Sequence, residues 1–269
     1  MRTSGGDPAP FGLGLSACPP KIEELDVHDD QPPGRRLQPL LHDLVTVVRA
    51  PAMVLSAADG QLRGVGAHGL FQGDYRMLSH AVLLIDGREA EPIAHTLAGP
   101  AAARFTSLIR WAGDAGADPT LRLDRVRRLG PEGMTEEVRI SSTARTAVTF
   151  TVTVDLGCDF APIEEVKAGG DAAPHLAHLE AGRLAWRQGV LSVVVTAPGA
   201  DLEPDLDARL AWEVTVPPGG RADLRWTVAV TDPRAVLVTP PAAPEWTRPE
   251  IRTYDRRLTR LLTHSLDDL

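Results

Sequence analysis

The sequence contains very little lysine: Lys21 and Lys167 are its only two, and arginine carries the rest of the positive charge. With 28 basic and 36 acidic residues, the formal net charge is −8. Binding to nucleic acid or to an anionic membrane requires a basic surface. The composition therefore argues against both kinds of partner.

Cysteine is also scarce, and long apolar runs are lacking. Cys18 and Cys158 are too few and too far apart to form a disulfide framework, which favours a reducing, cytoplasmic location. Residues 15–18 resemble a lipoprotein cleavage box, but the preceding apolar stretch, residues 11–17, is short and broken by glycine. No run approaches the roughly 18 apolar residues of a membrane span, so the sequence predicts no membrane insertion.

Motifs for cofactors and nucleophiles are missing or lack their context. Residues 64–69 spell G-x-G-x-x-G, but no strand–helix unit surrounds them, and a further glycine follows at Gly73. There is no Gly-Lys-Ser/Thr phosphate loop and no Gly-x-Ser-x-Gly elbow. His175 and His178 lack the glutamate of a zinc protease motif. We therefore predict no cofactor and no metal site.

Two pairs of adjacent glutamates are the remaining catalytic candidates. Neighbouring residues on a strand point to opposite faces, so such a pair cannot act jointly on one bond. For each pair we expect a solvated charge on one side of the strand rather than an acid–base pair, and we predict no catalytic residue. The pairs are Glu136 with Glu137 and Glu164 with Glu165.

Strict alternation of apolar and polar residues dominates the middle of the chain. Residues 147–156, 209–216 and 221–230 each place one apolar face opposite a polar one. Further strand candidates follow the same pattern, and Asp59-Gly60 and Asp86-Gly87 are typical of hairpin turns. Many short strands without intervening helices predict an all-β fold, an antiparallel β-sandwich of the supersandwich kind. The other candidates are residues 44–48, 53–57, 77–85, 104–111, 120–128, 135–141, 183–187 and 191–197.

Changes in composition and in the pattern of apolar residues divide the chain into four parts. Residues 1–38 are rich in Gly, Pro and Asp and predict a disordered leader. Residues 39–232 carry the sandwich, and residues 233–249 form a proline-rich linker. Residues 250–269 predict an amphipathic helix that begins with a capping box at Thr247 and Glu250. Its apolar stripe must bury against the sandwich or against a further domain.

The five tryptophans are candidates for stacking on sugar rings. Trp212 and Trp226 lie on the apolar faces of their alternating segments, so we expect both to be buried. Trp111 and Trp186 lie at strand ends beside loops and are the better candidates for an exposed platform.

Three ordered blocks of sequence resemble one known family. Residues 69–79 (GLFQGDYRMLS) are similar to the "GLF..DTR.LS" signature of the N-terminal domain of bacterial glycogen debranching enzymes of the amylo-α-1,6-glucosidase type. Residues 138–166 resemble a strand of the family followed by its "DFAD.FEVRG" turn, which begins here at Asp159-Phe160-Ala161. Residues 255–269 are similar to the passage into the catalytic domain. Departures from the pattern are Gln72-Gly73, Tyr75 and Met77.

The resemblance implies a non-catalytic domain. In the family the acid and base carboxylates belong to a helical (α/α)6 toroid that follows the sandwich. The sandwich is then expected to brace this toroid and to contact α-glucan. Asp74 and Arg76, two apart on one extended face, are expected to pair with each other or with a loop backbone, or to face the glucan or the toroid.

Two other functions stay open at this point. The chain could serve as a stand-alone interaction or assembly module without catalytic activity. It could also be an independent glycan-binding module that uses Trp111 and Trp186.

Overall fold

A computed structural model describes residues 41–170, 172–236, 249–250 and 252–267. The expected leader lies outside these residues, and so does most of the expected linker. Among the described residues, none of the helices has the length and apolar character that a membrane crossing requires.

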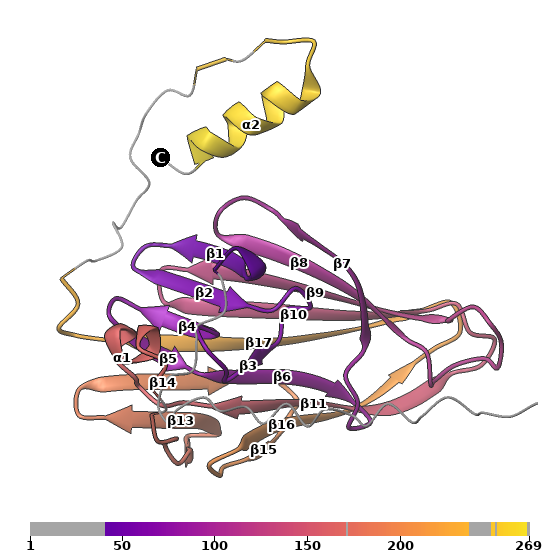
Figure 1. The fold of residues 1–269 in the computed structure, drawn as a ribbon. Coiled ribbons are helices and arrows are strands. Elements are labelled where there is room, and N and C mark those ends of the chain that lie inside the picture. Colours follow the sequence, from indigo (N-terminus) through magenta and orange to yellow (C-terminus); the bar gives the residue numbers. More distant parts are fainter. Residues whose placement is uncertain (1–40, 171, 237–248, 251, 268–269) are drawn as a thin grey trace, which may run out of the picture. The chain divides into compact units, whose positions relative to one another are not determined.

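The predicted antiparallel β-sandwich is confirmed, and it is built from three sheets (Figure 1). Every strand pairing within them is antiparallel. The eight-stranded sheet has the order β12 (His178–Glu180), β13 (Arg183–Gln188), β14 (Leu191–Thr196), β17 (Arg221–Thr231), β10 (Gly133–Ser142), β9 (Leu121–Gly130), β8 (Ala102–Ile109) and β7 (Glu91–Leu97). The five-stranded sheet has the order β15 (Asp201–Glu203), β16 (Ala208–Val216), β11 (Val148–Gly157), β6 (His80–Ile85) and β3 (Leu62–Arg63). The four-stranded sheet has the order β1 (Val45–Arg49), β2 (Ala52–Ser56), β4 (Gly69–Gln72) and β5 (Tyr75–Leu78).

The main core lies where the inward faces of the three sheets meet, and apolar side chains from all three contribute to it. Trp212 and Trp226 are buried as predicted. A second, smaller core covers the opposite face of the four-stranded sheet, where Leu55 and Phe71 pack with Val166 of α1 (Ile163–Lys167). The short sheet is therefore buried on both faces, which explains why β4 shows no alternation.

Turn positions were predicted better than the pairing of the strands around them. Asp59-Gly60 does turn the chain, but it joins β2 to β3, which belong to different sheets, so it is not a hairpin. Asp86-Gly87 forms a tight turn closed by two hydrogen bonds between Ile85 and Arg88, and the chain then crosses to another sheet at β7. The predicted strand 77–85 is likewise two strands, β5 and β6, in separate sheets. The alternation of apolar and polar residues indicates that a strand has a buried face, but it does not indicate the sheet to which the strand belongs.

The C-terminal helix α2 (Arg256–Asp267) starts later than the predicted residue 250. Its cap is Asp255, whose Oδ1 accepts the backbone N–H groups of Arg257 at 2.8 Å and Leu258 at 3.4 Å. Thr247 of the predicted capping box lies outside the described residues, and the carboxylate of Glu250 bonds to Arg252 instead. With 12 residues, α2 is about 18 Å long.

Candidate functional site

The β4–β5 hairpin is anchored by a buried ion pair that joins two of the sequence blocks. Arg76 Nε donates to the two carboxylate oxygens of Asp159 at 3.2 and 3.0 Å, and Nη2 donates to Oδ2 at 2.5 Å. Both side chains are almost fully buried. Arg76 Nη1 also donates to the carbonyl oxygens of Gly66 and His68. Arg76 therefore ties its own hairpin to a loop and to the chain that follows β11.

The glycines of residues 64–69 make room for this arginine rather than for a phosphate. Gly64 and Gly66 have φ values of +69° and +54°, in the left-handed region that glycine adopts most easily. A Cβ atom on Gly69 would lie 2.6 Å from Cδ of Arg76. The hexad is a turn and a close-approach site around the Arg76 side chain.

Asp74 does not pair with Arg76, which corrects one of the two sequence expectations; the other, a bond from Arg76 to a loop backbone, is confirmed. Asp74 is exposed and lies in the turn between β4 and β5, so the chain is not extended from Asp74 to Arg76. Its contribution is a backbone one: its carbonyl oxygen accepts the N–H of Ile163 at 2.7 Å, which holds the start of α1.

The two tryptophan candidates lie in different environments. Trp186 is 0 % exposed, so its ring faces are closed to a sugar and the platform prediction is wrong for this residue. β13 lies inside the eight-stranded sheet, and Trp186 takes an inward position opposite Val193. Trp111 is half-buried at the end of β8, and the Arg88 guanidinium lies 5.9 Å from the centroid of its ring.

A buried charged cluster inside the sandwich was missed from the sequence, where Glu136 was treated only as a member of one of two glutamate pairs on strands. The other pair, Glu164 and Glu165, lies on α1 and not on a strand. Glu136 is fully buried, and its Oε1 accepts Arg125 Nε at 2.8 Å and Arg127 Nη2 at 3.3 Å. Arg127 Nη2 also donates to the carbonyl oxygen of Gly60, and Arg125 Nη1 donates to Gln61 Oε1 at 2.7 Å. Because the side-chain amide of Gln61 bonds to the backbone of Leu83, the cluster connects β9 and β10 to β6 in the opposite sheet.

Burial and charge act in opposite directions on Glu136. Desolvation by burial works to raise the pKa of its carboxyl group, but the charges of Arg125 and Arg127, together with their hydrogen bonds, outweigh it and lower the pKa. The sequence signal was present. Arg125 and Arg127 occupy every second position of β9 together with the buried Leu123 and Leu129, so all four side chains point inward.

Cys158 has a structural role. Its thiol is buried and donates to the carbonyl oxygen of Met77 at 2.8 Å. Burial raises its pKa, so the reactive thiolate form is disfavoured.

The two histidines of the sequence motif lie in different surroundings. His175 contacts the ring of Phe160 edge-on, while His178 is exposed on β12.

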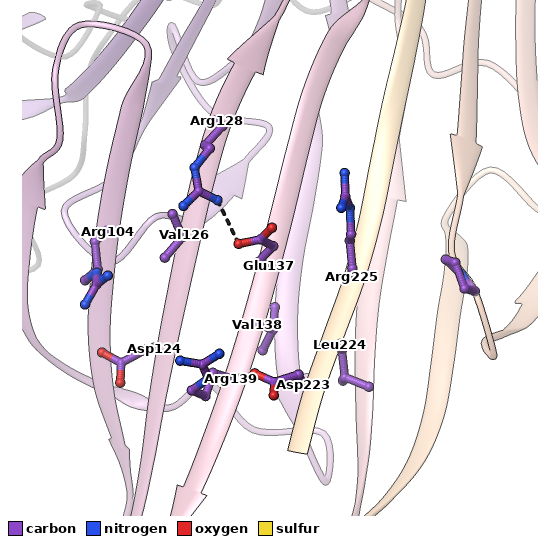
Figure 2. A pocket seen from close by; sticks show the side chains of 11 residues that line it. Arg104, Asp124, Val126, Arg128, Glu137, Val138, Arg139, Asp223, Leu224 and Arg225 are labelled. Carbon is purple, nitrogen blue, oxygen red and sulfur yellow. Dashed lines mark hydrogen bonds and ion pairs between the residues drawn. The ribbon is translucent and has the colours of Figure 1, made fainter. Parts of the chain in front are cut away.

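The outer face of the eight-stranded sheet carries a charged hollow of about 650 Å³ (Figure 2). Strand register arranges its side chains in cross-strand rows. One row runs Arg104, Val126, Glu137, Arg225 across β8, β9, β10 and β17. The next row runs Thr106, Asp124, Arg139, Asp223 across the same strands.

Some of these charged groups form ion pairs with each other, whereas two of the arginines do not. Arg128 donates to Glu137 at 2.7 Å, the dashed contact in Figure 2, and Arg139 donates to Asp223 at 2.6 Å. Within the part of the chain that the structure describes, neither Arg104 nor Arg225 has an ion pair. The hollow therefore holds uncompensated positive charge in a chain whose net charge is −8.

The chain leaves the sandwich beside the anchored hairpin. After β17, the guanidinium of Arg234 lies 5.3 Å from the ring centroid of Tyr75 in β5. The backbone N–H of Arg234 also donates to Asp232 Oδ1 at 3.0 Å. The first contact places Arg234 against the hairpin that Arg76 anchors, and the second shapes the turn locally.

Comparison with known proteins shows one matching family and several solved structures that are similar to this chain. A family model described as the N-terminal domain of (some) glycogen debranching enzymes matches residues 47–227. No curated protein matches the chain. A galactose mutarotase-like protein from Lactobacillus casei ATCC 334 is similar in structure, with 10% sequence identity and a TM-score of 0.46 over 70% of this chain and 100% of that one. A galactose mutarotase-like protein from Clostridium acetobutylicum has 7% identity and a TM-score of 0.41 over 70% and 98% of the two chains.

Proposed function

Because this chain belongs to the family of N-terminal domains of some glycogen debranching enzymes, we propose that it is a non-catalytic β-sandwich that braces the helical catalytic domain of such an enzyme. The observation that carries the proposal is the match over residues 47–227. Two of the sequence blocks that resemble the family, residues 69–79 and 138–166, lie within this range and meet at the Arg76–Asp159 pair. A domain that positions another domain must be rigid, and a buried, bidentate ion pair between segments distant in sequence contributes to rigidity.

The place where the chain leaves the sandwich supports the same proposal. A domain that positions its successor needs a defined exit, and the stacking of Arg234 on Tyr75 provides one next to the anchored hairpin. Beyond it, α2 carries the leucines Leu258, Leu261 and Leu262, of which Leu261 is 63% exposed. We propose that this leucine face packs against the helical catalytic domain.

The carboxylates of the outer face favour a non-catalytic role. Hydrolysis of a glycosidic bond needs one protonated carboxyl group beside one carboxylate. In the hollow, Asp124, Glu137 and Asp223 each accept a hydrogen bond from an arginine. This supports a domain whose enzyme depends on carboxylates elsewhere.

The isolated chain is therefore expected to release no glucose from limit dextrin or from a maltooligosaccharide. The measurement is a reducing-sugar assay with a complete debranching enzyme as the positive control. Turnover by the purified chain that survives repeated purification would contradict the non-catalytic proposal.

Self-association tests the competing proposal of a stand-alone assembly module, which the exposed leucine face of α2 motivates. Such a module should form oligomers through this face, and an L258E/L262E variant should then be monomeric in analytical ultracentrifugation. If the chain instead braces a catalytic domain, it should sediment as a monomer at micromolar concentration, with and without the substitutions.

Contact with α-glucan is the second part of the proposal, and Trp111 is the side chain to which it applies. Calorimetric titration with maltoheptaose should give binding heat for the natural chain and none for W111A. No heat with the natural chain would remove this part of the proposal and leave the bracing role untouched.

A further inference from the structure

The charged hollow on the outer face has the properties of a binding site that bracing does not require. Its volume of about 650 Å³ falls in the range of small-molecule sites. All of its lining residues lie in the described part of the chain, and none of them is aromatic. A neutral glucan, which depends on stacking against aromatic rings, has no platform here.

The unpaired guanidinium groups indicate an anionic ligand. Arg104 and Arg225 are exposed and stand at the two ends of one cross-strand row, about 14 Å apart at Cα for three strand spacings. In Figure 2 Val126 and Glu137 lie between them, and the two guanidinium groups extend in opposite directions along their strands. Binding one anion with both groups therefore requires each side chain to turn toward the middle of the row. Guanidinium is the side-chain group that best matches the paired oxygens of phosphate and carboxylate.

The carboxylates of the hollow indicate that the same ligand also carries hydroxyl groups. Thr106 and Arg122 occupy Oδ1 of Asp124, and Arg128 occupies Oε2 of Glu137. The second oxygen of each carboxylate has no partner among the described residues. Both oxygens can therefore accept hydrogen bonds from ligand hydroxyls, of which a sugar carries several.

We propose that this hollow binds a sugar that carries an anionic group, with Arg104 and Arg225 holding the phosphate or carboxylate and with Asp124 and Glu137 accepting the sugar hydroxyls. The inference is independent of bracing and of turnover, because it concerns a different face and requires no reaction. Phosphate esters and sugar acids share the required chemistry.

Titration calorimetry on the complete chain at low ionic strength tests the proposal. The probes are glucose 1-phosphate, glucose 6-phosphate and glucuronate, with maltose and inorganic phosphate as comparisons. At least one charged sugar should bind, more tightly than inorganic phosphate, while maltose should not bind at this site. The phosphate esters and the sugar acid form separate arms, which show which anion the arginines prefer.

The variant R104Q/R225Q should weaken that binding at least about tenfold, since charge-assisted bonds to both arginines are lost. The control R49Q/R145Q removes the same charge from exposed positions outside the hollow and should bind like the natural chain. Thermal unfolding of each variant verifies that it folds. The proposal is overturned by no heat with any charged sugar, by equal binding of inorganic phosphate, or by equal losses in the two double variants.

Discussion

Replacing Glu136 with glutamine is expected to lower the free energy of unfolding by about 3–5 kcal/mol, because the substitution removes one partner of a buried ion pair. Arg125 and Arg127 would be left facing each other in the core with their shared carboxylate gone. Arg127 already has its Nε and Nη1 atoms buried without a hydrogen-bond partner within the described chain, so little remains to compensate. Urea denaturation followed by tryptophan fluorescence measures the change.

The neighbouring residue supplies a matched control. Glu137 has the same side chain and pairs with Arg128, but it lies on the outer face and its side chain is 46% exposed. Glu137→Gln should cost less than about 1 kcal/mol, as exposed ion pairs do. Equal losses for the two variants would show that the inward cluster contributes no more than a surface pair.

The Glu136 cluster also predicts how stability depends on pH. The pKa of Glu136 is lower in the folded chain than its ordinary value of 4.5, so folding favours the ionised form. Its contribution is complete above pH 4.5 and is lost as the pH falls through the lower folded pKa. Acid denaturation of E136Q should therefore show a shallower loss of stability below pH 4.5 than the natural chain. Parallel curves would argue against this assignment.

Replacing Asp159 with asparagine is expected to cost about 3 kcal/mol, at the lower end of the range for a broken buried pair. Asparagine retains one acceptor, and Arg76 keeps the carbonyl oxygens of Gly66 and His68, so part of the network survives. The loss should be local as well as global: amide hydrogen exchange should accelerate in the β4–β5 hairpin and in residues 64–69.

A surface pair of the same geometry controls for the Asp159 result. Arg187 donates to both oxygens of Glu180 from Nε and Nη2, but both side chains are exposed. Glu180→Gln should change the unfolding midpoint little, because water screens the pair and can replace it. A loss in D159N no larger than that in E180Q would mean that the pair does not anchor the hairpin.

Most of the strands that sequence reasoning found have one buried face, although β2, in the short sheet that is buried on both faces, was found as well. β9, β10, β11 and β16 alternate in burial along their length, as their sequences do. The strands it missed break that rule for physical reasons. β4 is covered by a core on each face, and β7 is exposed along its whole length. β3, β12 and β15 have only two or three residues each, too few for a period to appear.

The candidate sites were predicted only in part. The sequence pointed to Arg76 through its motif, but the expected partner Asp74 is two residues away, whereas the actual partner Asp159 is 83 residues away. Trp186 was taken for an exposed residue because it stands near a strand end, although its inward position buries it. Neither the Glu136 cluster nor the charged hollow was foreseen, since each collects side chains from several strands.

By itself, the sequence determined the all-β class, the buried faces of the long strands, the positions of the turns and the family, because alternation, turn chemistry and ordered motifs are local properties of the chain. Only the tertiary structure decided which strands share a sheet, which carboxylate neutralises each buried arginine and which outer-face arginines have no ion pair among the described residues. Those outcomes depend on register between strands far apart in the chain, and a shift of one residue would exchange every inward side chain for an outward one.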